Sequence, residues 1–231
     1  MPGLLMPLEQ TVYNVDMTCD SCVQSVKSAL SSVAGCDKFD IDLQNKRVSV
    51  EGTAPPSHII QAIQDTGRDV IIRGTGKPNS AAVAILESFD PKDNAEPVRG
   101  LARIVATNDS RLLVDITLNG VDPGTYKPSF RASGNISNGA LSTGKSIFDF
   151  GSIEVGPSSA GQSFESANLG IHELIGRSFV VQKEGSELKE ALAGVIARSA
   201  GVWENDKQVC SCSGKTVWQE RQDAHKQGLK I

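Results

Sequence analysis

Four of the five cysteines form two close pairs, Cys19/Cys22 and Cys210/Cys212, near opposite ends of a 231-residue chain. Thiolates that converge on one ion are soft ligands, and soft ligands select soft metals such as Cu(I). In a reducing compartment, close pairs also carry out thiol–disulfide chemistry. The remaining cysteine, Cys36, stands alone beside Gly35, and we expect a small, inert, half-buried residue there.

The first pair lies in the sequence Met-Thr-Cys-Asp-Ser-Cys, between an alternating stretch and a stretch of helical spacing that starts at Cys22. The backbone N–H groups at the start of a helix favour negative charge and therefore the thiolate form. Two ligands leave an ion open to attack by another thiol, which suits transfer rather than storage. The alternative is a redox pair of the thioredoxin type.

The second pair, Cys210-Ser211-Cys212, has a single residue between its thiols. In an extended strand both side chains share one face, so they can meet a common ion. A disulfide that closes so small a ring would be strained, and strained disulfides exchange readily. This pattern predicts metal capture, thiol exchange with a partner, or both.

The elements around these pairs predict three parts. Residues 8–74 read as a β-α-β-β-α-β unit of the ferredoxin-like kind, with Ser57 as the cap of its second helix. A glycine- and proline-containing linker follows at 75–80. Short β-like runs separated by turns fill 81–200 and predict an all-β sandwich or barrel. Residues 201–231 are polar, and we expect a mobile tail there.

The bulk composition excludes several classes of function. Hydrophobic residues make up 39%, charged residues 22%, and the net charge is -4, so no basic excess indicates nucleic acid. Residues 1–7 are too short and too poor in basic residues for a secretory signal, and no apolar run has the length of a membrane span. We therefore expect a cytoplasmic protein.

The first unit resembles the heavy-metal-associated domain of copper chaperones and copper ATPases, on the Met17-Thr18-Cys19-Asp20-Ser21-Cys22 motif in its β-α-β-β-α-β frame. The resemblance implies Cu(I) bound by Cys19 and Cys22. It also suggests that Met17 is a buried packing residue. For Arg68, in the loop before the last strand, we expect a solvated surface arginine; the alternative is that it lies near the pair and offsets its charge.

The central part resembles copper/zinc superoxide dismutase in the stretches 124–135, 170–181 and 194–197. The resemblance implies a Greek-key β-barrel. However, Ser129, Arg131 and Gln182 stand where that family has copper-binding histidines. The chain has three histidines in all, in different regions, and they are His58, His172 and His225. We therefore expect neither an active dismutase nor a zinc site in this part.

Stretches 195–205, 207–212 and 218–221 resemble the end of the copper chaperones for superoxide dismutase. This resemblance implies a metallochaperone, not an enzyme. It would take Cu(I) from a copper transporter and deliver it to apo copper/zinc superoxide dismutase. Cys210 and Cys212 would also promote the target's intrasubunit disulfide. A general thiol–disulfide oxidoreductase is the alternative.

The same resemblance implies a partner and further locations. The barrel would pair with an immature dismutase subunit as a heterodimer, because dismutase barrels form symmetric dimers. The alternative is that the barrel pairs with itself as a homodimer. Besides the cytoplasm, the expected locations include the mitochondrial intermembrane space and the nucleus.

Overall fold

The computed structural model describes residues 9–77, 79–108, 110–201 and 215–226. They form two compact units. The first contains the described part of 9–81 with 105–108 and 199–201, and the second contains the other described residues. Within these described ranges, no helix is long and apolar enough to cross a membrane. The predicted domain limits are not decided by this division and stay predictions.

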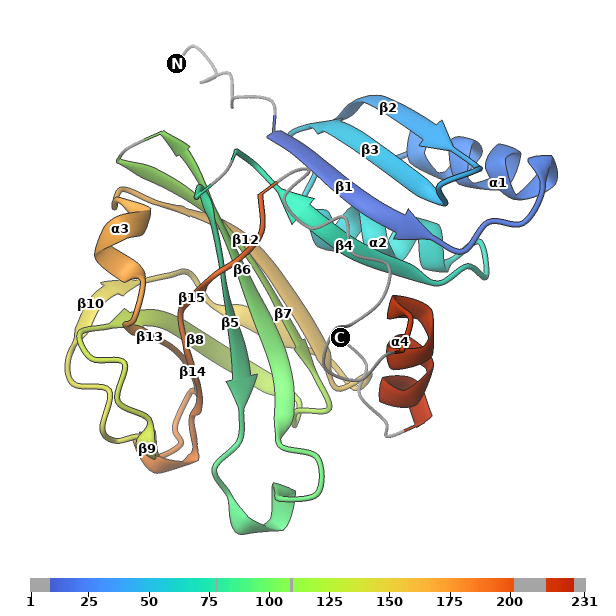
Figure 1. The fold of residues 1–231 in the computed structure, drawn as a ribbon. Coiled ribbons are helices and arrows are strands. Elements are labelled where there is room, and N and C mark those ends of the chain that lie inside the picture. Colours follow the sequence, from blue (N-terminus) through green and yellow to red (C-terminus); the bar gives the residue numbers. More distant parts are fainter. Residues whose placement is uncertain (1–8, 78, 109, 202–214, 227–231) are drawn as a thin grey trace. The chain divides into compact units, whose positions relative to one another are not determined.

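The first unit is a four-stranded antiparallel sheet with two helices, in the predicted β-α-β-β-α-β order (Figure 1). Its elements are β1 (Glu9–Val15), α1 (Asp20–Ser31), β2 (Cys36–Asp42), β3 (Arg47–Gly52), α2 (Pro56–Gln64) and β4 (Val70–Thr75). The strand order is β2-β3-β1-β4. The ferredoxin-like fold is therefore confirmed for this unit.

The helices of this unit pack through apolar side chains one turn apart. Val26 and Leu30 on α1, and Ile59 and Ile63 on α2, are fully buried in one core with Tyr13. A spacing of four residues places such side chains on the same helix face. This core holds the start of α1 in place relative to the sheet.

Both helix starts differ from the prediction. Helix α1 begins at Asp20 with Cys19 as its N-cap, not at Cys22. Helix α2 begins at Pro56 with Pro55 at the N-cap position, so the predicted Ser57 cap is wrong. Proline suits the first helical position because its missing N–H would have no partner there. Ser57 lies inside the helix and is buried.

The second unit is a nearly closed antiparallel β-barrel (Figure 1). Its strands are β5 (Ala81–Glu87), β6 (Val98–Asn108), β7 (Arg111–Asn119), β8 (Gly124–Arg131), β9 (Ser137–Ala140), β10 (Ser146–Asp149), β11 (Ile153–Val155), β12 (Ala160–Ala167), β13 (Ser178–Lys183), β14 (Leu192–Val195) and β15 (Ala197–Arg198). Short helices are η1 (Pro91–Asp93), α3 (Ile171–Leu174) and η2 (Leu188–Glu190).

The sheet path explains the closure of the barrel. It runs β10-β8-β13-β14-β5-β6-β7-β12, and β11 also pairs with β8. A Cβ on Gly161 of β12 would lie within 3 Å of Val155 and Ile153, so β12 lies against β11. Neighbouring strands are often distant in sequence, as the predicted barrel requires.

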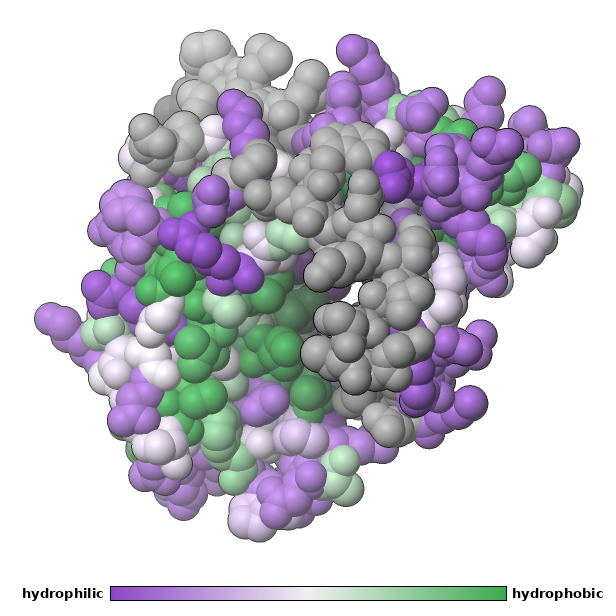
Figure 2. Space-filling view, viewed as in Figure 1, coloured by the Kyte–Doolittle hydropathy of each residue, from purple (hydrophilic) through white to green (hydrophobic). Residues whose placement is uncertain are grey.

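The barrel keeps two apolar side chains exposed on adjacent strands. Ile85 on β5 is 47% exposed and Val195 on β14 is 38% exposed. Strands β5 and β14 pair, and a Cβ on Gly194 would lie 1.9 Å from the carbonyl oxygen of Ile85. Hydrophobic side chains gather over these strands on the face shown in Figure 2.

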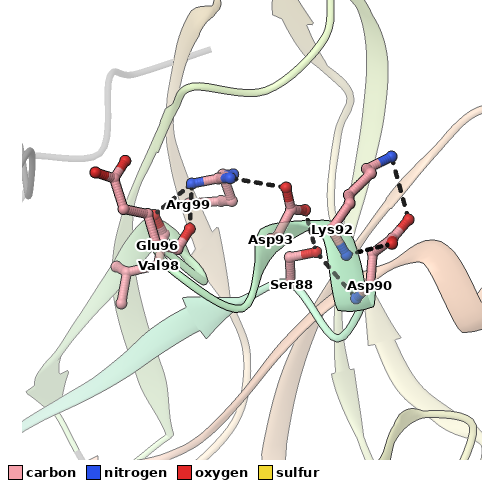
Figure 3. Close-up of polar contacts among 7 residues, drawn as sticks. All are labelled: Ser88, Asp90, Lys92, Asp93, Glu96, Val98 and Arg99. Carbon is pink, nitrogen blue, oxygen red and sulfur yellow. Dashed lines mark hydrogen bonds and ion pairs between the residues drawn. The ribbon is translucent and has the colours of Figure 1, made fainter.

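The loop between β5 and β6 is braced by its own side chains (Figure 3). Ser88 donates a 2.6 Å hydrogen bond to Asp93, which also accepts one of 2.9 Å from Arg99. Asp90 pairs with Lys92 at 3.1 Å. A cavity of about 310 Å³ lies beside this loop, and these four charges on its wall are already paired. We therefore place the chemistry elsewhere.

The C-terminal segment contains a helix that the sequence analysis did not predict. Helix α4 (Val217–Lys226) starts after Thr216, whose hydroxyl accepts a 3.2 Å hydrogen bond from the backbone N–H of Gln219. The Gln219 side chain accepts one of 2.8 Å from the Thr216 N–H. This reciprocal pair is a capping box, and the Thr-x-x-Gln spacing was a signal for it in the sequence.

Candidate metal centre

The structure brings the first predicted cysteine pair together. Cys19 is the N-cap of α1 with extended backbone, and Cys22 lies in the first turn. Its N–H donates to the Cys19 carbonyl at 3.0 Å, and the two Sγ atoms lie 3.5 Å apart. Both are free thiols, with Cys19 exposed and Cys22 half-buried. Two sulfurs this close can reach a common ion with a small movement.

Hydrogen bonds ionise one thiol of this pair. The backbone of Thr18, then the side chain of Arg68, then the Thr18 hydroxyl lower the pKa of Cys22 to about 6. The hydroxyl lies 3.7 Å from the Cys22 Sγ. We had expected the helix N-terminus to favour the thiolate, but these contacts from Thr18 and Arg68 are the main causes. No pattern in the sequence marks Thr18 for this role.

Arg68 lies near the pair, as one of the two expectations stated. Its guanidinium donates to the Thr66 carbonyl at 2.6 Å and helps to lower the pKa of Cys22. Its Nε is buried without a hydrogen-bond partner. A fixed positive charge beside a thiolate stabilises the ionised form. The expectation of a freely solvated arginine is therefore wrong, and the alternative of an arginine near the pair is correct.

Two other sulfur-containing residues of the first unit, Met17 and Cys36, have environments that suit a packing role. Met17 is 1% exposed and packs in the core of the first unit, as predicted. Cys36 begins β2 and is half-buried, and burial raises the pKa of its thiol. An uncharged, half-buried thiol is a poor metal ligand, so Cys36 fits the inert role that we expected.

In the barrel, Arg131 and Gln182, two of the three residues that stand where dismutases have copper-binding histidines, make other hydrogen bonds. Ser129 is buried on β8. Arg131 donates to the Thr143 hydroxyl at 3.2 Å and to the Gly144 carbonyl at 2.5 Å. Gln182 on β13 donates to the Ser186 carbonyl at 2.8 Å. Arg131 and Gln182 thus hold loops.

The three histidines lie on three different helices, His58 on α2, His172 on α3 and His225 on α4. Across the part of the chain that the structure describes, no three His, Cys, Asp or Glu side chains converge to form a site with three or more protein ligands. A two-sulfur site at Cys19 and Cys22 lies below that number of ligands. An ion held by these two sulfurs could still accept a third thiol ligand from a partner.

The second predicted pair, Cys210 and Cys212, lies outside the described residues. Its role in metal capture or thiol exchange stays a prediction.

The chain is similar to proteins of known family. The family model of the heavy-metal-associated domain matches residues 12–69. A superoxide dismutase 1 copper chaperone of Debaryomyces hansenii is 53% identical over 96% of this chain and 98% of its own length. One of Saccharomyces cerevisiae is 45% identical over 96% and 97%.

A solved structure titled as the apo form of the heavy-metal-associated domain of a copper chaperone for superoxide dismutase is also similar. It is 31% identical, covers 33% of this chain and 79% of its own, and has a TM-score of 0.31. The full-length relatives carry the assignment, because they match both units and the C-terminal segment at high identity. The chain belongs to the family of copper chaperones for superoxide dismutase.

Proposed function

We propose that the chain carries Cu(I) on the thiolates of Cys19 and Cys22 and delivers it to apo copper/zinc superoxide dismutase. The observation that carries this proposal is the pair of sulfurs 3.5 Å apart, exposed at Cys19 and half-buried at Cys22, where the pKa is about 6. Thiolates are soft ligands that favour Cu(I). Copper is the cargo of this protein, and the chain is a metallochaperone rather than an enzyme.

Transfer proceeds by exchange of ligands. An incoming thiolate adds to the two-coordinate ion, and one of the two cysteines then leaves. Cys19 is the more exposed of the pair, so it is the sulfur that a donor or acceptor reaches first. The donor would be a copper transporter or a thiol pool, and the reducing cytoplasm would keep both cysteines as free thiols.

The barrel would dock on an immature dismutase subunit and form a heterodimer. Ile85 and Val195 support this proposal, because they are exposed apolar side chains on paired strands. Apolar side chains grouped on one face indicate a protein contact. A homodimer through the same face is the competing arrangement in the absence of the target.

Cys210 and Cys212 would act at the target after docking. If they carry a disulfide, exchange reduces it to two thiols while two target thiols become a disulfide, so electrons balance between the two proteins. The short Cys-x-Cys ring favours this direction because its disulfide is strained. We place this step mainly in the cytoplasm, with the intermembrane space and the nucleus as further locations.

The experiment mixes Cu(I)-loaded chain with metal-free, reduced dismutase and measures dismutase activity and heterodimer mass. The wild type and the control Cys36→Ser should mature the target. Cys19→Ser/Cys22→Ser should lose stoichiometric Cu(I), and Cys210→Ser/Cys212→Ser should keep it on the first pair yet fail in maturation. A wild-type chain that holds no Cu(I) under reducing conditions would be a thiol–disulfide oxidoreductase instead.

A further inference from the structure

Lys46 has an unusual backbone conformation. It lies close to the segment that leads into the metal loop, which we define as residues 17–22. It ends the turn between β2 and β3 with φ of 52°, in the left-handed region that glycine and asparagine adopt most easily. Asp42 fixes this turn by accepting hydrogen bonds from the backbone and side chain of Asn45. A lysine in this conformation is a strained residue, and such residues often mark a functional role.

The conformation directs two groups of Lys46 at the segment that leads into the cysteine pair. Its carbonyl accepts a 2.8 Å hydrogen bond from the N–H of Val15. Its ammonium contacts the Asp16 carboxylate at 2.6 Å. Asp16 also donates its N–H to the Asp69 carbonyl at 3.0 Å, in the loop that carries Arg68. The entry to the metal loop is thus held from two sides.

The turn itself does not require the Lys46 ammonium. Glycine would allow the same turn and the same carbonyl contact. The lysine side chain, which glycine lacks, pairs with the carboxylate of Asp16, and Asp16 lies three residues before Cys19. That separation is at most about 11 Å along the chain, close to the Debye length of about 8–10 Å. Because Cu(I) with two thiolates carries a net negative charge, an unpaired carboxylate at this distance would oppose copper binding.

We propose that Lys46 is a positioning residue for copper retention, which neutralises Asp16 and orients the segment before Cys19. The inference rests on the proposed binding of Cu(I) by Cys19 and Cys22. It concerns a turn that is distant in sequence from both cysteines and contributes no ligand.

The test measures Cu(I) retention by the full chain in competition with bicinchoninate, together with thermal unfolding. Lys46→Gly should raise the Cu(I) dissociation constant about twofold to fivefold, the range of an exposed ion pair, while the midpoint of unfolding stays equal or rises. Glycine relieves the positive φ, so copper retention should fall without a loss of stability. A purely structural role for Lys46 would lower both.

Further variants separate charge from backbone. Lys46→Arg keeps a cation for Asp16 and should retain wild-type affinity. Asp16→Asn combined with Lys46→Gly should restore affinity, because no unpaired carboxylate remains. Lys127→Ala removes a 2.7 Å ion pair with Glu184 in the barrel and should leave Cu(I) binding unchanged.

Two results would overturn the inference alone, namely wild-type affinity in Lys46→Gly, or no recovery in the double variant. If instead the wild type binds Cu(I) no better than Cys19→Ser/Cys22→Ser, the proposed function itself fails and the inference fails with it.

Discussion

At the scale of single residues, the surroundings of each cysteine decide its chemistry. Cys22 receives hydrogen bonds from Thr18 and Arg68, which lower its pKa to about 6. Burial, followed by the nearby charge of Asp37, raises the pKa of Cys36. The same side chain is therefore a thiolate at one position and a neutral thiol at the other. Only the thiolate is a nucleophile and a metal ligand.

This difference predicts selective alkylation of the metal-free chain. At pH 7 Cys22 is about nine-tenths ionised, so iodoacetamide should modify it well before Cys36, as measured by peptide mass spectrometry. Its rate should fall as the pH falls through 6, because the thiol then becomes protonated. Cu(I) retention should weaken over the same range, since protons compete for the sulfur. Thr18→Val should slow the alkylation of Cys22 at pH 6.5. Equal alkylation rates at Cys22 and Cys36 would contradict the assignment of the thiolate to Cys22.

At the scale of elements, side-chain hydrogen bonds tie loops to strands of the barrel. Arg131 at the end of β8 reaches Thr143 and Gly144, in the segment that leads to β10. Arg177, just before β13, donates to the Ala132 carbonyl at 2.6 Å. These contacts hold the long connection from β8 to β10 on the barrel. Hydrogen bonds within the protein therefore keep this connection ordered.

Removing one of these donors should loosen that connection. Arg131→Ala removes the donor of the Gly144 carbonyl, which is exposed, so the local opening free energy should fall by about 0.5–1.5 kcal/mol. Hydrogen exchange of amides in 132–149 measures this change. Lys127→Ala on the same strand is the control, because it removes only an exposed ion pair. Unchanged exchange in Arg131→Ala would show that the loop is held by other contacts.

At the scale of the whole molecule, the first unit has its own hydrophobic core. That core contains residues of β1, β3, β4, α1 and α2 and positions the cysteine pair. The barrel depends on its own close strand contacts. At Gly194 the backbone of Ile85 lies so close that there is no room for a Cβ. A defect in the barrel should therefore leave the metal site intact.

The Gly194→Ala variant tests this independence. Its Cβ would lie 1.9 Å from the Ile85 carbonyl oxygen, so β5 and β14 must separate and the barrel should lose about 3 kcal/mol or more. Gly156→Ala, with no atom within 4 Å of the new Cβ, is the matched control. Cu(I) titration should give wild-type binding for both variants, whereas hydrogen exchange in β5 and β14 should rise only in Gly194→Ala. Loss of Cu(I) binding in Gly194→Ala would argue against separate units.

Local patterns in the sequence were sufficient for much of this protein. Alternation and helical spacing predicted the β-α-β-β-α-β unit, because side-chain periodicity follows directly from backbone geometry. Short β-like runs separated by turns predicted an all-β sandwich or barrel, and the resemblance to dismutases implied the barrel. The spacing of Cys19 and Cys22 predicted a common site, since residues so close in the chain cannot separate far. Helix α4 had an equally local signal in Thr216 and Gln219, which the analysis did not use.

Contacts between residues distant in the chain were decided only by the tertiary structure. The register of β4 and the preceding loop brings Arg68 to Cys22, and the β2–β3 turn brings Lys46 to Asp16. In the barrel, the path of Arg131 to Thr143 depends on how the loop after β8 folds back. The ionisation of a thiol depends on the distance and direction of such partners. Periodicity along the chain determines neither, so the sequence located the sulfur pair and the fold determined its charge.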